Sequence, residues 1–122
     1  MIKPPKLQHG QKAAAVSLSW GGPGAFPHRY EAGKRQFEAE FGMQVVEMPH
    51  TLADPQWLAR NPQARAADLI QAFTDPEITA VISTIGGEDS LRILRYLDPD
   101  VFRLHPKAVS YTHLTLPTNR EV

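Results

Sequence analysis

The chain has 122 residues and a mass of 13.6 kDa, which suits one small domain or part of a larger protein. Its 13 basic and 13 acidic side chains cancel, so the sequence favours neither nucleic acid nor a membrane as a partner. It contains no cysteine, which excludes disulfides and thiolate nucleophiles, and no apolar run is long enough to span a bilayer. The N-terminus lacks the apolar core of a signal peptide, so we expect a cytoplasmic protein.

Three short apolar runs predict the strands of a buried parallel sheet. They cover residues 13–18, 43–48 and 79–85, and a turn or a proline follows each of them. Continuous runs of this length are typical of strands that are buried on both faces. A fourth strand is expected to start near Lys107, although the sequence beyond it shows no sustained strand or helix pattern.

Helical periodicity fills the two intervals between these three runs. Aromatic residues recur at helical spacing from Pro27 to Phe41, and Gly42 follows as a typical helix terminator. Residues 50–60 are polar and irregular, which predicts a loop. Asn61 and Pro62 predict a helix start, because asparagine caps helices well and proline suits the first helical position. The apolar stripe of this second helix consists of Ala66, Leu69, Ile70 and Phe73.

A third helix is expected after the glycine turn at 86–87. Asp89 or Ser90 would cap it, and Asp98 with Pro99 would end it. Strands and helices therefore alternate along the chain, which predicts an α/β fold with a Rossmann-like parallel sheet and right-handed crossovers.

Two glycine-rich turns mark the candidate functional edge of this sheet, because ligands of such folds bind outside the carboxyl ends of the strands. The turns lie at 21–24 and 86–87, where backbone N–H groups can hold a phosphate, a carboxylate or an oxyanion. The alternative is that these glycines only permit tight turns. Residues 21–24 depart from the dinucleotide fingerprint, although Glu47 ends a strand where a ribose-binding acid would lie.

The sequence contains no recognisable catalytic or metal-binding motif of its own. The serines at the candidate edge lie outside the pattern of a nucleophile elbow and are interpreted as strand or cap residues; they are Ser17, Ser19, Ser83 and Ser90. The five histidines lack metal-ligand spacing, so we expect neither a metal nor a cofactor. Trp20, at a strand end, either lines a pocket or covers the sheet edge.

Several ordered segments together resemble the LD-carboxypeptidases, which are serine peptidases of the muramoyltetrapeptide carboxypeptidase type. The resemblance covers roughly residues 3–107, and its Gly-Gly-Glu-Asp-Ser form is nearer to the microcin C self-immunity branch. The segments that carry the resemblance are 3–7, 16–19, 26–31, 42–48, 61–69, 72–76 and 85–90.

The resemblance implies a two-domain hydrolase with a Ser-Glu-His triad, of which the N-terminal, Rossmann-like domain supplies the serine. That serine belongs to a Gly-Tyr-Ser-Asp motif a few residues after the Pro-Lys that is Pro106-Lys107 here. The present sequence reads Val-Ser-Tyr-Thr-His-Leu at 109–114, so the nucleophile is not assigned to Ser110. Residues 1–109 are therefore expected to be an incomplete N-terminal domain. Residues 110–122 resemble translated sequencing-adapter read-through and are interpreted as a non-native tail.

What the resemblance does imply for this chain is an oxyanion and substrate-binding turn. The residues that match the family's positions there are Gly86, Gly87, Glu88, Asp89 and Ser90. The parent protein is expected to cleave an amide next to a free carboxylate, in a murein peptide or a peptidyl-nucleotide, and to form a homodimer in one interpretation. The chain itself is expected to be inactive. The alternatives are a non-catalytic nucleotide-binding module that uses residues 21–24 and Glu47, and an interaction module without a small-molecule site.

Overall fold

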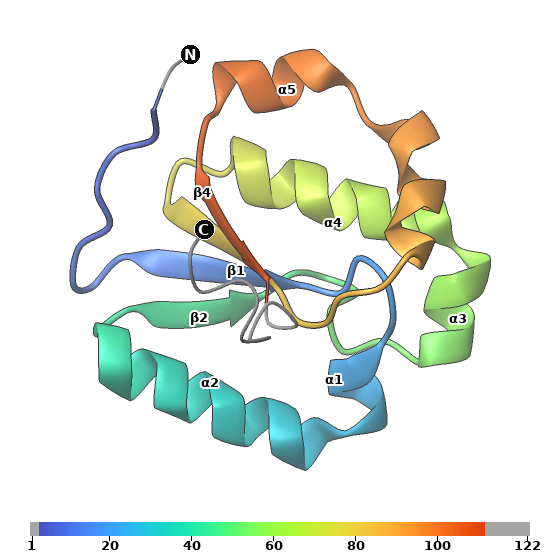
Figure 1. Cartoon of the computed structure of the whole chain (residues 1–122), viewed down its shortest axis with the longest axis horizontal. Helices are drawn as coiled ribbons and strands as arrows, with labels where there is room; N and C mark the ends of the chain where they lie inside the picture. Colours follow the sequence, from blue (N-terminus) through green and yellow to red (C-terminus); the bar gives the residue numbers. More distant parts are fainter. Residues whose placement is uncertain (1–2, 112–122) are drawn as a thin grey trace, which may run out of the picture.

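The computed structural model describes residues 3–111, which fold around a four-stranded parallel sheet (Figure 1). The strand order is β2-β1-β3-β4, and each neighbouring pair of strands runs parallel. The predicted α/β class and its parallel sheet are therefore confirmed. The strands are β1 (Lys12–Val16), β2 (Gln44–Glu47), β3 (Ile78–Ser83) and β4 (Ala108–Tyr111).

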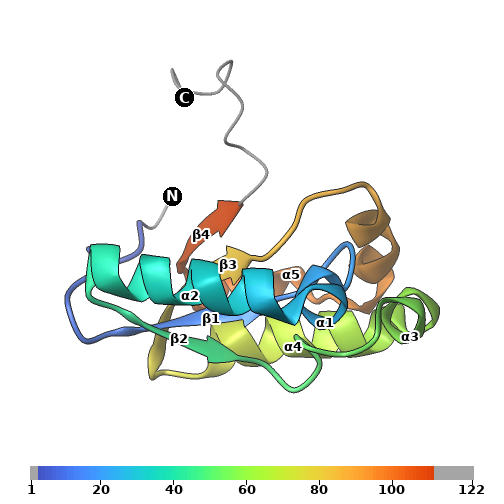
Figure 2. The same ribbon diagram turned by 90° about the horizontal axis from the view of Figure 1, so that it is seen from below.

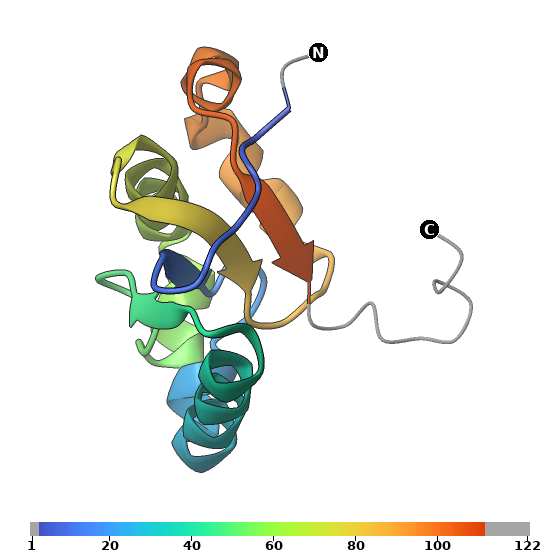
Figure 3. The same ribbon diagram turned by 90° about the vertical axis from the view of Figure 1, so that its left-hand side faces the viewer.

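Helices lie on both sides of this sheet. When the molecule is turned, α2 lies on one side, and α4 and α5 lie on the other (Figures 2 and 3). The chain passes from β1 to β2 in one direction and from β2 through β3 to β4 in the other, and right-handed crossovers then place the connecting helices on opposite faces. The helices are α1 (Gly22–Ala25), α2 (Pro27–Phe41), α3 (Pro55–Arg60), α4 (Pro62–Thr74), the 3₁₀ helix η1 (Asp89–Tyr96) and α5 (Pro99–Leu104).

The main hydrophobic core lies between the sheet and α4. Val16, Val81 and Phe73 belong to it, and Phe102 of α5 packs edge-on against Phe73 with ring centroids 4.8 Å apart. A smaller cluster on the opposite face joins Ala13 and other sheet residues to Phe37 of α2. Residues 13–16 are buried on both sides, which explains why β1 is a continuous apolar run.

Two helices lie where the sequence predicted a loop or a helix end. The segment 50–60 contains α3, whose first turn is capped by the Asp54 carboxylate, which accepts a hydrogen bond from the Trp57 N–H. Asp98 and Pro99, expected to end a helix, begin α5, and the Asp98 carboxylate accepts from the Asp100 N–H. Both helices start with an aspartate followed by a proline at the first helical position, which suits proline.

The helix after the second glycine turn is a 3₁₀ helix, and its predicted cap is wrong. Glu88 occupies the cap position without a side-chain hydrogen bond, and Asp89 is the first helical residue. Ile93 is buried, whereas Leu91 and Leu94 are exposed. A helix with about three residues per turn does not align the apolar positions that an α-helix would gather on one face.

The fourth strand forms at the predicted place. It pairs with β3 from Ala80↔Ala108 to Ser83↔Tyr111. Lys107, just before it, donates from Nζ to the carbonyl oxygens of Ala72 and Asp75 at 2.8 and 2.6 Å, so it caps the end of α4. The expected non-native tail begins inside β4, and its residues 112–122 lie outside the described part of the chain.

Candidate functional site

The topological switch point of the sheet lies between β1 and β3. From β1 the chain crosses to β2 on one side, and from β2 it returns past β1 to β3 on the other. In open parallel sheets the carboxyl ends of two such strands flank the ligand-binding crevice. The two predicted glycine turns follow β1 and β3, so the topology brings both to this point.

A cavity of about 190 Å³ lies beside the second turn, and we call it the glycine-turn cavity. Of the five predicted site residues, Gly86, Gly87 and Ser90 line this cavity, whereas Glu88 and Asp89 do not. Ser19, from the segment that follows β1, also lines the cavity. The other lining residues are Ser83 and five apolar residues, namely Leu18, Leu69, Ile93, Leu94 and Leu97.

Gly87 has a backbone conformation that only glycine adopts readily, with φ of +143°. A Cβ atom there would lie 3.2 Å from Ser19 Cβ, and Ser19 Oγ donates to the Gly87 carbonyl at 3.2 Å. Within residues 3–111, the N–H groups of Gly86 and Gly87 donate no hydrogen bond to the protein. Two unused backbone donors at a strand end are suited to hold an oxyanion or a carboxylate.

Arg65 of α4 fixes the segment that follows this turn. Its side chain is fully buried, and Nη1 donates to the Leu18 carbonyl at 2.8 Å and lies 3.0 Å from Asp89 Oδ2. Its Nε and Nη2 have no hydrogen-bond partner among the described residues. Since burying an unpaired charge is costly, Asp89 acts as the counter-ion of Arg65 and holds the start of η1 in place. This pair was missed at the level of sequence, because arginine on an amphipathic helix is ordinarily solvated.

A second cavity of about 310 Å³ lies next to the glycine-turn cavity, and we call it the aromatic cavity. Trp20 lines it, which decides between the two interpretations of that residue in favour of a pocket. The edge therefore forms cavities, contrary to the expectation for an interaction module without a small-molecule site. The lining residues are Trp20, Gly22, Pro23, Phe26, Arg29, Tyr30, Thr84 and Ile85.

The first glycine turn is shaped by packing against the loop before α3. A Cβ at Gly24 would lie 2.4 Å from the Ala53 carbonyl oxygen, and one at Gly21 would lie 2.8 Å from Pro55 Cα. Neither glycine could be replaced without moving backbone, so tight packing accounts for both. The structural interpretation of this turn is therefore the better one.

Glu47, the candidate ribose ligand, is hydrogen-bonded to two side chains of α2. Its Oε2 accepts hydrogen bonds from Tyr30 Oη and from Lys34 Nζ, the latter at 3.0 Å. Burial alone would raise the pKa of Glu47, but these two hydrogen bonds outweigh it and lower that pKa. Burial and the bond to Glu47 raise the pKa of Tyr30. Glu47 thus joins α2 to β2 and is not free for a ribose, which removes the acid on which the nucleotide-module alternative rests.

Three of the four edge serines, Ser17, Ser19 and Ser83, donate hydrogen bonds to backbone carbonyl groups. Ser17 Oγ donates to the Thr51 carbonyl at 2.8 Å, and Ser83 Oγ donates to the Ile85 carbonyl at 3.1 Å. Ser110 lies within β4 rather than on a turn. Among residues 3–111, no group of histidine, aspartate and glutamate side chains could hold a metal ion, and no helix is long and apolar enough to cross a membrane.

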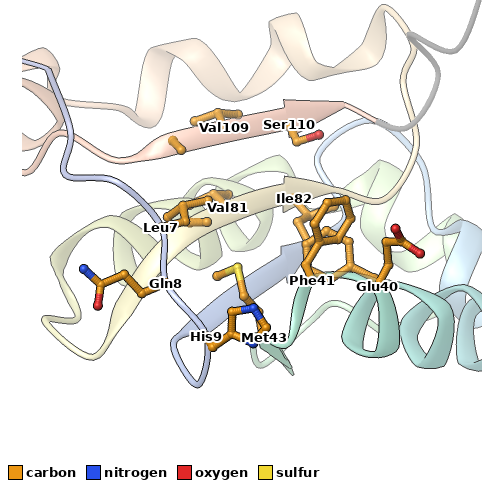
Figure 4. A pocket seen from close by; sticks show the side chains of 13 residues that line it. Leu7, Gln8, His9, Glu40, Phe41, Met43, Val81, Ile82, Val109 and Ser110 are labelled. Carbon is orange, nitrogen blue, oxygen red and sulfur yellow. The ribbon is translucent and has the colours of Figure 1, made fainter.

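A larger cavity lies away from this edge, on the sheet face next to α2 (Figure 4). It has a volume of about 440 Å³. Phe41 and Glu40 of α2, His9 of the N-terminal segment and Ser110 of β4 line it (Figure 4). This apolar groove crosses a sheet face, whereas the two smaller cavities lie at the strand ends where α/β folds hold ligands.

A protein-family model described as the LD-carboxypeptidase N-terminal domain matches residues 14–111. The chain belongs to this family. It is 33% identical over 79 residues to the Bacillus subtilis protein named "Putative carboxypeptidase YocD", covering 64% of this chain and 24% of that protein. It is 28% identical over 116 residues to the Vibrio cholerae protein named "Putative carboxypeptidase VC_A0337", covering 94% of this chain and 34% of that protein. This LD-carboxypeptidase domain thus spans between a quarter and a third of those relatives.

Solved structures of similar fold agree with the family assignment. The MccF-like protein from Streptococcus pneumoniae, solved with AMP, has a TM-score of 0.71 and 30% identity, over 83% of this chain and 30% of that one. The MccF-like protein from Bacillus anthracis has a TM-score of 0.70 and 30% identity, over 89% of this chain and 33% of that protein. The microcin C7 self-immunity protein MccF, solved with aspartyl sulfamoyl adenosine, has a TM-score of 0.75 and 24% identity, over 89% of this chain and 32% of that protein. At this identity it supports the fold alone.

Proposed function

We propose that this chain forms the substrate-binding edge of a cytoplasmic, serine-type LD-carboxypeptidase-like hydrolase. The reaction is cleavage of an amide next to a free carboxylate, in a murein peptide or a peptidyl-nucleotide. The observation that carries the proposal is the glycine turn after β3, where Gly86 and Gly87 line the glycine-turn cavity and their N–H groups donate no hydrogen bond within residues 3–111. These two donors would stabilise the oxyanion that develops when a hydroxyl attacks the amide carbonyl.

Two contacts support this role by fixing the turn before substrate arrives. Arg65 holds Asp89 from one side, and Ser19 donates to the Gly87 carbonyl from the other. A donor that is already oriented stabilises developing charge without reorganising, and removing one such donor typically raises the barrier by about 2.7–4 kcal/mol. The relatives' names as carboxypeptidases, and the AMP bound by the Streptococcus pneumoniae protein, are consistent with both substrate classes.

The chain by itself is proposed to bind such a substrate without cleaving it. Its sequence at 109–114 lacks the Gly-Tyr-Ser-Asp motif, so no serine is placed as a nucleophile. Without nucleophile and base, the oxyanion donors alone leave little catalysis to measure.

The test combines a product assay with a binding measurement. Purified chain is mixed with a murein tetrapeptide or with an aspartyl-nucleotide amide, and amide NMR resonances are followed. We expect no product, and shifts of the Gly86 and Gly87 resonances with at least one compound. Turnover above a heat-treated control would contradict the proposed inactivity. Unmoved glycine resonances with both compounds would contradict the proposed site.

A further inference from the structure

Helix η1 lines two separate cavities with different residues. Ser90, Ile93 and Leu94 line the glycine-turn cavity, whereas Arg92 and Arg95 line a further cavity of about 400 Å³, which we call the arginine cavity. The rest of the arginine cavity is formed by the end of α3 and the first turn of α4, which lie beside η1 (Figure 1). It has no lining residue in common with the two cavities at the strand ends, so it is separate from the proposed hydrolase site.

Three arginines line this cavity, namely Arg60, Arg92 and Arg95. Among the described residues, Arg60 and Arg95 form no ion pair. Arg92 lies 3.4 Å from Asp89, but that carboxylate also lies 3.0 Å from the fully buried Arg65. One acid thus serves two arginines, and the cavity keeps an excess of positive charge although the whole chain has a formal net charge of zero.

Two of these arginines have contacts that orient them in the absence of a ligand. Arg92 Nη2 donates to the Ala59 carbonyl at 2.7 Å and so joins η1 to the end of α3. The guanidinium carbon of Arg95 lies 5.6 Å from the centre of the Tyr96 ring, and Tyr96 lines the same cavity. Side chains that are already oriented lose less conformational entropy on binding.

A phosphate group is the ligand whose charge best matches this cavity. A guanidinium binds phosphate or carboxylate through paired hydrogen bonds. A carboxylate has one charge and two oxygens, whereas a phosphate monoester carries about two charges near pH 7 and has three strong acceptor oxygens. Three arginines that share one acid therefore suit phosphate better. Leu91 and Tyr96, which are 68% and 41% exposed, could contact the organic part of an ester.

We propose that the arginine cavity binds a small ligand with a phosphate group, either inorganic phosphate or a phosphate monoester, through Arg60, Arg92 and Arg95. Its volume lies within the range of small-molecule sites. The inference goes beyond the proposed function, because it depends on neither the glycine turn nor the hydrolysis of an amide.

The first test is a titration with inorganic phosphate, followed by NMR of the arginine Nε–H groups. Sodium chloride is exchanged for phosphate at constant ionic strength, so that general screening does not change. We expect saturable shifts of the Arg60 and Arg95 signals. The signal of Arg35, an exposed arginine of α2 without an ion pair among the described residues, should not move. Equal, unsaturated shifts of all three signals would indicate an adventitious ion only and would overturn the inference.

Calorimetric titration of variants then assigns the contacts. Arg60→Gln and Arg95→Gln should each weaken phosphate binding about tenfold, the effect of losing one hydrogen bond to a charged group. Arg35→Gln is the matched control and should bind phosphate like the unmodified chain. The replaced arginines are exposed, so urea unfolding should be nearly unchanged in all three variants. Equal phosphate affinity of the Arg60→Gln, Arg95→Gln and unmodified chains overturns the inference.

Two further compounds identify the source of the phosphate group. Tighter binding of phenyl phosphate than of inorganic phosphate would assign the cavity to a monoester, whereas equal or weaker binding would assign it to the free ion. Succinate, a dicarboxylate, should bind more weakly than either, and equal affinity for succinate would overturn the choice of phosphate. None of these compounds contains the amide on which the proposed function is tested, so each proposal can fail without the other.

Discussion

Individual polar side chains hold the candidate site together, and Arg65 is the chief of them. It joins α4 to the end of β1 through the Leu18 carbonyl and to η1 through Asp89. Its charge is taken wholly out of water, so its partners must be kept in place. Asp89 also faces the exposed Arg92 at 3.4 Å, and this second pair is open to solvent.

Replacing Arg65 by methionine should therefore loosen the glycine turn. We expect the free energy of unfolding to fall by about 3 kcal/mol, because Asp89 and the Leu18 carbonyl lose a buried partner. Urea unfolding measures the loss, and amide exchange at Gly87 should become faster. Arg92→Gln is the control, since an exposed pair contributes no more than about 1 kcal/mol. Equal losses in the two variants would show that Arg65 has no special role.

The Glu47 carboxylate gives the fold a dependence on pH. Its pKa is lowered in the folded chain from 4.5, so its contribution to stability is present above that pH and is lost as the pH falls through the lower, folded value. The pKa of Lys34, raised chiefly by its hydrogen bond to Glu47, adds stability that is lost only as the pH rises above 10.5.

The Glu47→Gln variant should accordingly be less sensitive to acid. At neutral pH it should be less stable by about 1 kcal/mol, the value of one hydrogen bond to a charged group at a partly exposed site. Between neutral pH and about pH 3 its stability should fall less steeply than that of the unmodified chain. Urea unfolding at each pH tests this, with exposed Glu40→Gln as the control. Parallel pH curves for Glu47→Gln and the unmodified chain would contradict the assignment.

At the scale of elements, two glycines of neighbouring helices have opposite roles. Gly24 of α1 lies against the loop before α3, where a Cβ would be 2.4 Å from the Ala53 carbonyl. Gly33 lies inside α2, and a Cβ there would meet nothing within 4 Å. The first glycine allows two elements to approach closely, whereas the second only weakens its own helix.

Alanine should therefore have opposite effects at the two sites. Gly24→Ala is expected to lower the free energy of unfolding by about 2 kcal/mol or more, because backbone must move to admit the methyl group. Gly33→Ala should raise it by about 0.5–1 kcal/mol, because alanine favours the helix and restricts the unfolded chain. Thermal and urea unfolding of the two variants provide the comparison. A neutral Gly24→Ala would argue against tight packing at α1.

At the scale of the molecule, the two faces of the sheet are covered unequally. Helices α4, η1 and α5 pack on one face, while the other carries α2 and the 440 Å³ groove beside it (Figure 3). Phe41, which lines the groove, is 54% exposed. The chain spans at most about a third of the curated relatives it matches, and an apolar groove of this kind is available to bind apolar probes.

The folded chain should therefore bind the dye ANS while its near-ultraviolet circular dichroism remains native. Phe41→Lys should reduce the dye signal, because a charge then enters the groove. Leu104→Lys is the control, since Leu104 is 72% exposed and lies on α5, away from the groove. Equal reductions in both variants would show that the dye binds scattered side chains instead of the groove.

The sequence alone determined the sheet, its strand positions and helices α2 and α4. Apolar runs at 13–18, 43–48 and 79–85 are long enough to be buried, and Gly42 and Asn61 mark helix ends by local backbone chemistry. The second glycine turn was also placed at the carboxyl edge. These features depend on residues close together in the chain, so periodicity and turn residues suffice to find them.

The tertiary structure decided which of these residues meet. Arg65 forms an ion pair with Asp89, which lies 24 residues later in the sequence. The Glu47 carboxylate accepts hydrogen bonds from two side chains of α2 and is therefore not free to bind a ligand. The short helix α3 was missed because residues 50–60 are polar and show no apolar stripe, and α5 was missed because Asp98 and Pro99 were expected only to end a helix. Burial and ion pairing depend on which elements pack together, and a pattern read along one segment contains no information about the segment that will lie against it.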